Sequence, residues 1–258
     1  MNFTNNCPHT IFWKDFNSQK ITLFLMGDIR KDYVIDREVI FNPTTKKNTS
    51  TTKCPYCPGN ESMTNPSLLS LVARDGMLQR LQDDDDSFVE TWSVRVFESK
   101  NPVVSTSTEN TYTDRPLYSE PAYGYHYIVV ASPQHKDTLA TIDIEQWSNV
   151  LVVIQDRLRW LYTQRGVTYV SIFVNHGKGA GSIVDHSHIN VVSFSTLPPI
   201  IEAEAASSHK IYNERGVCPM CQIVNTENAG PRQILQTEEF IAFCPWAPSH
   251  PFEFWICP

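Results

Sequence analysis

The stretch from Phe173 to Phe194, FVNHGKGAGSIVDHSHINVVSF, constrains this chain more than any other part of its sequence. A short apolar run leads into three glycines within five positions, and a His-Ser-His sequence opens a second apolar run. This order predicts a strand, a tight loop and a second strand. Because side chains alternate along a strand, His186 and His188 are expected on the same face, about 6.5–7 Å apart along the backbone.

Two imidazoles on one face can share a metal ion, or one can hold structure while the other does chemistry. Glycine allows a close backbone approach, so N–H groups of the loop from Asn175 to Gly181 could point at an anion, and the Asn175 amide could donate to it as well. The plainer alternatives are half-buried histidines and an ordinary hairpin turn. Because the loop directly precedes the histidine pair, we interpret the two together as a functional site.

Cysteine spacing points to metal binding. Four of the seven cysteines form two Cys-x-x-Cys pairs, Cys54 with Cys57 and Cys218 with Cys221. A disulfide scaffold fits poorly with an odd count in an acidic chain of this size, and a thioredoxin-like redox site needs a βαβ context that the sequence does not show. Paired thiolates two residues apart suit a tetrahedral zinc site. For the second pair, further ligands are harder to find.

Composition and charge exclude several classes of function. The chain has 258 residues, 41% of them hydrophobic, and a formal charge of −7. It can therefore build one large domain or two of about 130 residues, and it lacks the overall basic footprint of a protein that binds duplex nucleic acid. The sequence contains no run of about 18 apolar residues, so it predicts no membrane span. Its N-terminus does not have the pattern of a signal peptide. A cytoplasmic location is expected.

The pattern of elements predicts an α+β fold with a mostly antiparallel sheet covered by a helix. The helix over 143–165 is the most regular, with apolar residues at helical spacing, a capping box of Asp143 and Gln146, and Gly166 as its stop. We also expect a helix from Pro66, a solvated loop over Asp83–Asp86 and a connector over 195–217. The predicted strands cover a hairpin within 20–45 and the segments 92–97, 125–131, 168–174 and 186–194.

The C-terminal part repeats features of the first. CPMCQIV resembles CPYCPGN, and EFIAFCPWAPSHPFEFWICP resembles SEPAYGYHYIVVASP. This predicts a first unit over 1–195 that carries the motifs, followed by a connector and the start of a second, incomplete unit over 196–258. We expect either that the natural chain continues beyond Pro258 or that the second unit is degenerate.

Five blocks in order carry a resemblance to a known family. They are CPYCPGNE (54–61), WSVRVFESKNP (92–102), SEPAYGYHYIVVASPQHKDTL (119–139), the glycine-histidine block (173–190) and CPWAPSHPFEFWICP (244–258). Together they resemble the galactose-1-phosphate uridylyltransferase branch of the histidine-triad superfamily, from about Asp28 to Pro258. The resemblance implies two histidine-triad-like units, each a mostly antiparallel sheet with covering helices.

The resemblance also implies a mechanism. The second histidine of the motif, His188, would attack the α-phosphorus of a nucleoside diphosphate sugar, forming a nucleotidyl-histidine and releasing a sugar 1-phosphate by ping-pong kinetics. A phosphate or sugar-phosphate acceptor would then take the nucleotide. The attacking nitrogen must be unprotonated, so the other ring nitrogen should donate to a fixed acceptor such as a backbone carbonyl. The resemblance also implies that the protein forms a homodimer.

Residue roles follow by the same resemblance. Zinc ligands would be Cys54, Cys57, His135 and His186, with His126 as the alternative to His135. A second zinc would involve Cys218 and Cys221, with His250 as a weaker candidate. The nucleotide would lie against Phe97, Ser99 and Lys100, with a core strand as the equal alternative for that segment. The remaining substrate-binding positions are Asn175, Gly177, Gly181 and Ser182, and Asn190 joins His188 as catalytic.

Three departures from the family pattern raise alternatives. Asn190 replaces the family's glutamine, Ile183 stands where a serine usually contacts phosphate, and the segment Tyr33–Lys47 lacks the usual arginines. Fewer charge-assisted contacts to phosphate would weaken its binding. The alternative functions are a dinucleoside polyphosphate or phosphoramidate hydrolase and a zinc-stabilised nucleotide-binding protein without turnover.

Overall fold

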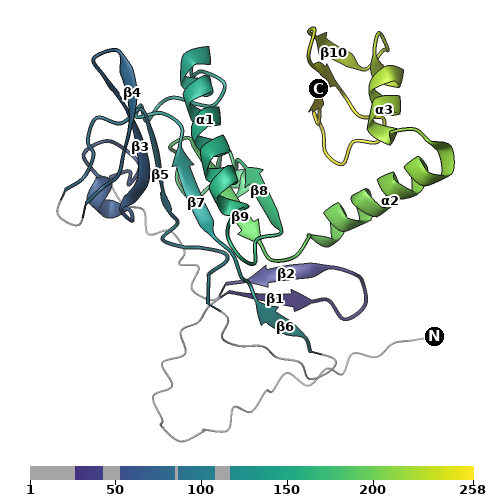
Figure 1. Ribbon diagram of the computed structural model, residues 1–258, viewed down its shortest axis with the longest axis horizontal. Helices are drawn as coiled ribbons and strands as arrows, with labels where there is room; N and C mark the ends of the chain where they lie inside the picture. Colours follow the sequence, from purple (N-terminus) through teal and green to yellow (C-terminus); the bar gives the residue numbers. More distant parts are fainter. Residues whose placement is uncertain (1–26, 43–52, 85–86, 108–116) are drawn as a thin grey trace, which may run out of the picture.

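A six-stranded sheet forms the centre of the protein (Figure 1). The structure is a computed structural model that describes residues 27–42, 53–84, 87–107 and 117–258. The strands run in the order β4-β3-β5-β7-β9-β8, and every neighbouring pair is antiparallel. Their bounds are β3 Ser67–Arg74, β4 Met77–Leu81, β5 Val94–Glu98, β7 His126–Val130, β8 Tyr169–Phe173 and β9 His188–Phe194. The expected α+β class with antiparallel sheets is confirmed.

The helix α1, Ile144–Leu161, covers one face of this sheet (Figure 1). Its buried residues Val150, Val153, Ile154 and Leu161 join the main core with alternate residues of β5, β7 and β9. The side chain of Asp143 accepts a hydrogen bond from the Gln146 backbone N–H, as the predicted N-cap requires. The opposite face of the sheet is not covered by α1, and the candidate functional residues lie on that face.

The predicted start of α1 is right, and three details of the prediction are wrong. The Gln146 side chain does not close a capping box; it donates to the backbone carbonyls of Ser93 and Ala131 and so fastens the helix to the sheet. The helix ends at Leu161 rather than near Gly166, which lies in a turn with φ of 82°. Two of the apolar residues at helical spacing, Ile144 and Leu151, face solvent instead of the sheet.

A small sheet lies beside the central one. It has the order β2-β1-β6, with β1 Asp28–Lys31, β2 Glu38–Phe41 and β6 Ser119–Pro121. The hairpin of β1 and β2 falls within the predicted range, of which residues 20–26 and 43–45 lie outside the described part. Two 3₁₀ turns complete the elements of this region, η1 Glu61–Met63 and η2 Lys178–Ala180.

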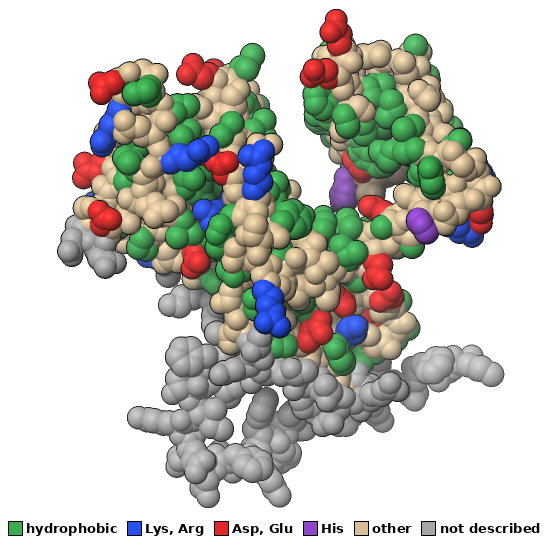
Figure 2. Space-filling view, in the orientation of Figure 1, with side chains coloured by type: hydrophobic (Ala, Val, Ile, Leu, Met, Phe, Trp, Pro, Cys, Tyr) green, Lys and Arg blue, Asp and Glu red, His purple; other side chains and the backbone are tan. Residues whose placement is uncertain are grey.

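The C-terminal elements stand apart from the central sheet (Figure 1). The helix α2, Pro199–Arg215, leads to a small part made of α3, Pro219–Glu227, and a three-stranded sheet in the order β10-β11-β12. These strands are β10 Gln233–Gln236, β11 Ile241–Phe243 and β12 Trp255–Cys257. Figure 2 shows many hydrophobic side chains on the visible face of this part.

Most of the expected connector over 195–217 is the helix α2. Two sequence predictions fail in the fold. Residues 67–81 form the hairpin β3–β4 instead of a helix. Asp83 is not a solvated residue, because its fully buried carboxylate pairs with Arg95 at 2.7 Å; Asp85 and Asp86 lie outside the described residues. No helix among the described residues is long and apolar enough to cross a membrane.

Candidate active site and metal centre

The strand β9 presents His188 and Asn190 on the sheet face opposite α1. Side chains alternate along the strand, so Ile189 and Val191 join the core under α1 while the polar pair points the other way. The neighbouring strand β7 places His126 on the same face as this pair, since its Nε2 lies 3.1 Å from the Asn190 Oδ1. All three polar side chains are buried.

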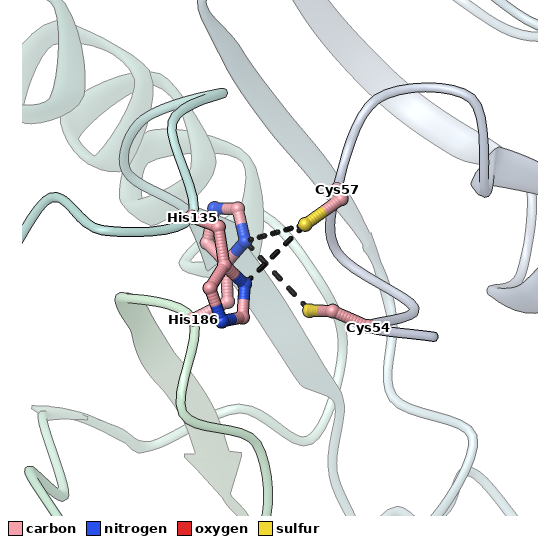
Figure 3. Close-up of side chains that lie close together, drawn as sticks. All are labelled: Cys54, Cys57, His135 and His186. Carbon is pink, nitrogen blue, oxygen red and sulfur yellow. Dashed lines mark hydrogen bonds between the residues drawn. The ribbon is translucent and has the colours of Figure 1, made fainter. Parts of the chain in front are cut away.

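Two cysteines and two histidines converge next to this face (Figure 3). The ligand atoms of Cys54, Cys57, His135 and His186 all lie within 4.8 Å of one another. The Cys57 Sγ is 3.3 Å from the His135 Nδ1 and 3.5 Å from the His186 Nδ1, while the Cys54 Sγ is 3.8 Å from the His186 Nδ1. Among the described residues, this group alone could hold a metal ion.

The donor set fits zinc. Tetrahedral zinc, with bonds of about 2.3 Å to sulfur and 2.0 Å to nitrogen, places its sulfur and nitrogen ligands about 3.5 Å apart. The observed separations lie around that value. Burial, with Cys54 beside it, raises the pKa of Cys57 to about 11. A cation is therefore what would favour the thiolate form here. His126, the alternative ligand, is outside the group.

Backbone and hydroxyl contacts orient the ligands. The Nε2–H of His186 donates to the Ser132 carbonyl at 2.7 Å, which leaves its Nδ1 lone pair turned to the thiols. The hydroxyl of Ser187 donates to the Asp137 carbonyl, and the hydroxyl of Ser132 donates to the Asp137 carboxylate. The turn that carries His135 is thus tied to the start of β9. The sequence analysis did not identify these serines, although Ser187 lies between the two histidines of the motif.

His188 has a defined orientation. Its Nδ1–H donates to the His186 carbonyl at 2.8 Å, so its Nε2 carries the free lone pair. Burial lowers its pKa, which favours the neutral ring. The ring of Tyr56, from the loop between the two cysteines, packs edge-on against it at 5.2 Å between centroids. This contact joins the metal loop to His188 and was not foreseen from the sequence.

A cavity of about 220 Å³ lies beside His188. Its wall includes Asn175, Gly177 and Ser182 of the glycine-rich loop, and His186 and His188 of the motif. Gly177 and Gly181 adopt positive φ values of 77° and 84°, which glycine accepts without strain. The Ser182 hydroxyl donates to the Val184 carbonyl. The arrangement can hold a small anion next to an imidazole nitrogen.

The expected nucleotide segment is divided between core and surface. Phe97 is buried in a cluster with Trp92, Ile128 and Val130, as in the core-strand alternative. Ser99 lines a second cavity of about 140 Å³ together with His126, whereas Lys100 is exposed.

The second cysteine pair starts α3. The Cys218 Sγ caps this helix by accepting the Cys221 N–H, and both residues are exposed. The structure groups no third ligand with them among the residues it describes, His250 included.

Comparisons with known proteins agree with this geometry. Residues 81–198 match the family described as galactose-1-phosphate uridyl transferase, N-terminal domain. The chain is 27% identical over 250 residues to ADP-glucose phosphorylase of Arabidopsis thaliana, which covers 90% of this chain and 65% of that protein. It is 27% identical over 236 residues to galactose-1-phosphate uridylyltransferase of Thermotoga maritima, which covers 90% of this chain and 67% of that protein.

Solved structures share the fold of this chain. A structure titled as uridylyltransferase superposes with a TM-score of 0.71 at 24% identity, covering 89% of this chain and 65% of the other. The Arabidopsis thaliana ADP-glucose phosphorylase with bound ADP-glucose superposes with a TM-score of 0.64 at 25% identity, covering 89% and 67%. Over residues 81–198 and in its fold, the chain is similar to galactose-1-phosphate uridylyltransferases. The chain is similar both to uridylyltransferases and to an ADP-glucose phosphorylase, and it spans about two thirds of their length.

Proposed function

We propose that this protein is a nucleotidyltransferase that acts on a nucleoside diphosphate sugar through His188. The observation that carries the proposal is the orientation of His188, whose Nδ1–H is held by the His186 carbonyl while its ring borders the cavity. The similarity to uridylyltransferases and to ADP-glucose phosphorylase supports the substrate class.

The proposed reaction has two displacements. The Nε2 lone pair of His188 attacks the α-phosphorus, the bond from that phosphorus to the bridging oxygen breaks, and the sugar 1-phosphate leaves with the bond's electron pair. An oxygen of the acceptor phosphate then attacks the same phosphorus, and the nitrogen–phosphorus bond breaks. His188 returns to its neutral form.

The surrounding residues have supporting roles. Backbone N–H groups of the loop containing Gly177 and Gly181 would bind phosphate oxygens, and the Asn190 amide would donate to the reacting phosphoryl group. Zinc held by Cys54, Cys57, His135 and His186 would supply a closed structural site that fixes the start of β9. Ser99 and Lys100 would border the nucleotide side, with the buried Phe97 supporting that segment from the core. Cys218 with Cys221 would belong to a second zinc site.

Organisation beyond the site is also proposed. A first unit over 1–195 would carry the chemistry, and residues 196–258 would form the connector and the beginning of a second unit. We propose a homodimer, as the family resemblance implies. The cytoplasmic location stays a prediction.

Covalent labelling tests the proposed function. UDP-glucose and ADP-glucose, each labelled in the α-phosphate, are incubated with wild-type protein, with His188→Ala and with His209→Ala, a control on the exposed face of α2. We expect acid-labile, base-stable label in the wild type and the control, and exchange that falls at least about 1,000-fold in His188→Ala. Water as the only acceptor would favour a hydrolase. Binding without label or turnover would leave a nucleotide-binding protein and overturn the proposal.

A further inference from the structure

His126 lies between two hydrogen-bonding partners, a backbone N–H group and a side-chain amide. Its Nδ1 is 3.3 Å from the Val103 backbone nitrogen, and its Nε2 is 3.1 Å from the Asn190 Oδ1. The residue is 9% exposed, so these partners replace most of the water that the ring would otherwise bind. Residue 103 belongs to the segment after β5, while Asn190 is on β9. The ring therefore connects two parts of the chain that are far apart in sequence.

The chemistry of these partners determines the protonation of the ring. A backbone N–H can only donate, so the His126 Nδ1 must accept and cannot carry a proton. The proton of the neutral ring is then on Nε2 and points at Asn190. An amide oxygen can accept it, whereas an amide NH₂ cannot. The oxygen of the Asn190 amide therefore faces His126.

The strand register places the other branch of the amide. Asn190 pairs with Ile128, His188 with Val130, and Val192 with His126. Along this face, Asn190 thus lies between His126 on one side and His188 on the other. Because the amide oxygen points toward His126, the NH₂ group of the same amide points away from His126. A donor is then available next to His188.

We propose that His126 is a positioning residue that fixes the Asn190 amide so that its NH₂ group donates to the phosphoryl group at His188. This inference rests on the proposed function. A flipped amide would place its oxygen next to phosphoryl oxygens and leave the buried Nε2–H without an acceptor. Because Asn190 is one methylene shorter than the glutamine of the family pattern, it has less freedom to correct a wrong orientation.

The first test does not depend on activity. Long-range ¹H–¹⁵N spectra of the full chain, with His126→Phe to assign the signals, report the tautomer of the ring. We expect a neutral ring with its proton on Nε2. A proton on Nδ1, or a charged ring at neutral pH, would overturn the inference whatever the protein catalyses.

The second test compares two replacements. His126→Phe keeps a ring but removes the donor, whereas His126→Gln retains an N–H donor at the position of Nε2. We expect kcat for nucleotidyl transfer to fall about 10- to 100-fold in His126→Phe, with a smaller change in KM, and most of kcat to return in His126→Gln. A residue with only a packing role would give the opposite order, because Phe fills the space of the ring better.

A double variant isolates the route of the effect. Asn190→Asp retains an acceptor for His126 and removes the donor to phosphate, so adding His126→Phe should lower kcat little further. Independent, multiplying losses would overturn the inference. Thermal unfolding of each variant sets an assay temperature at which all are folded. If the wild type transfers no nucleotide while its Nε2 carries the proton, the proposed function fails and the orientation of Asn190 stands.

Discussion

Three histidines on one side of the central sheet each have a ring nitrogen fixed by the protein backbone. His186 donates to the Ser132 carbonyl, His188 donates to the His186 carbonyl, and His126 accepts from the Val103 N–H. Burial is the leading cause that lowers the pKa of each ring. A neutral imidazole has one donor and one acceptor, so each backbone contact determines which nitrogen is free. These contacts leave a different nitrogen available in each ring, which suits the roles proposed for His186 as a ligand, His188 as the nucleophile and His126 as a positioning residue.

Asp83 allows a test of stability at the residue scale. Burial raises its pKa, but hydrogen bonds from the Val89 and Ser67 backbone N–H groups and from Arg95 outweigh this, so the pKa is lowered overall. A lowered folded-state pKa stabilises the fold above the unfolded pKa, about 3.9, and this stabilisation is lost as pH falls through the folded value. Asp83→Asn should reduce the free energy of unfolding by about 3 to 5 kcal/mol at pH 7, because it leaves Arg95 buried without its counterion.

Urea unfolding at pH 7 and at about pH 3 measures this effect. The difference between wild type and Asp83→Asn should shrink at the lower pH, since about pH 3 lies below the unfolded-state pKa of about 3.9 and the unfolded wild-type chain takes up a proton there. Asp84→Asn, next to it and exposed to a larger extent, is the matched control. A difference that is the same at both pH values would contradict the role of the buried charge pair.

The elements differ in how well the sequence predicted them. The sequence predicts the strands β5, β7, β8 and β9 and the helix α1 because the apolar residues of each follow a single spacing, and each element ends in a clear turn or cap. The hairpin β3–β4 was mistaken for a helix because its apolar residues also fit helical spacing. Its signal was Asp75-Gly76, which forms the two-residue turn with φ values of 52° and 74°. Asp-Gly between apolar runs is a strong hairpin signal.

The sequence predicted the metal ligands of the site but not the contacts that depend on the fold. Spacing and the family resemblance suggested Cys54, Cys57, His135 and His186, which the fold brings together. The contacts of His126 with Asn190 and of Tyr56 with His188 depend on the sheet register and on the path of the metal loop. No local sequence pattern contains either of those long-range arrangements.

The loop of the metal centre provides a test at the element scale. If zinc holds residues 54–57 against the start of β9, chelation with dipicolinate should lower the melting temperature and loosen the packing of Tyr56. Cys57→Ser should behave like the chelated wild type and should not respond to the chelator. Elemental analysis, thermal unfolding and near-ultraviolet circular dichroism measure these effects.

Cys221→Ser, in the other cysteine pair, is the control for that test. This variant keeps Cys54, Cys57, His135 and His186, so if they hold zinc its melting temperature should still fall on chelation. Wild-type protein that holds no zinc after growth in zinc-supplemented medium, or that melts unchanged after chelation, would contradict a stabilising metal at the first site.

At the scale of the whole molecule, α2 separates two parts of unequal construction. The part up to β9 has a core shared by six strands and a helix. The part made of α3 and β10–β12 has a small cluster around Ile241, Phe243 and Cys257, and side chains such as Trp246 and Phe252 are 81% and 98% exposed. Apolar side chains that are this exposed make the small part a poor candidate for independent stability.

The helix α2 allows a test of whether a second copy of the protein packs against it in solution. None of its 17 residues is buried, whereas α1 buries four. Isolated helices of this length are marginal in water, so without tertiary contacts the amides of α2 should exchange far faster than those of α1. Hydrogen–deuterium exchange at several protein concentrations measures this. Protection of α2 that equals that of α1 and decreases on dilution would show that a second copy covers the helix, while equal protection independent of concentration would contradict the exposed helix altogether.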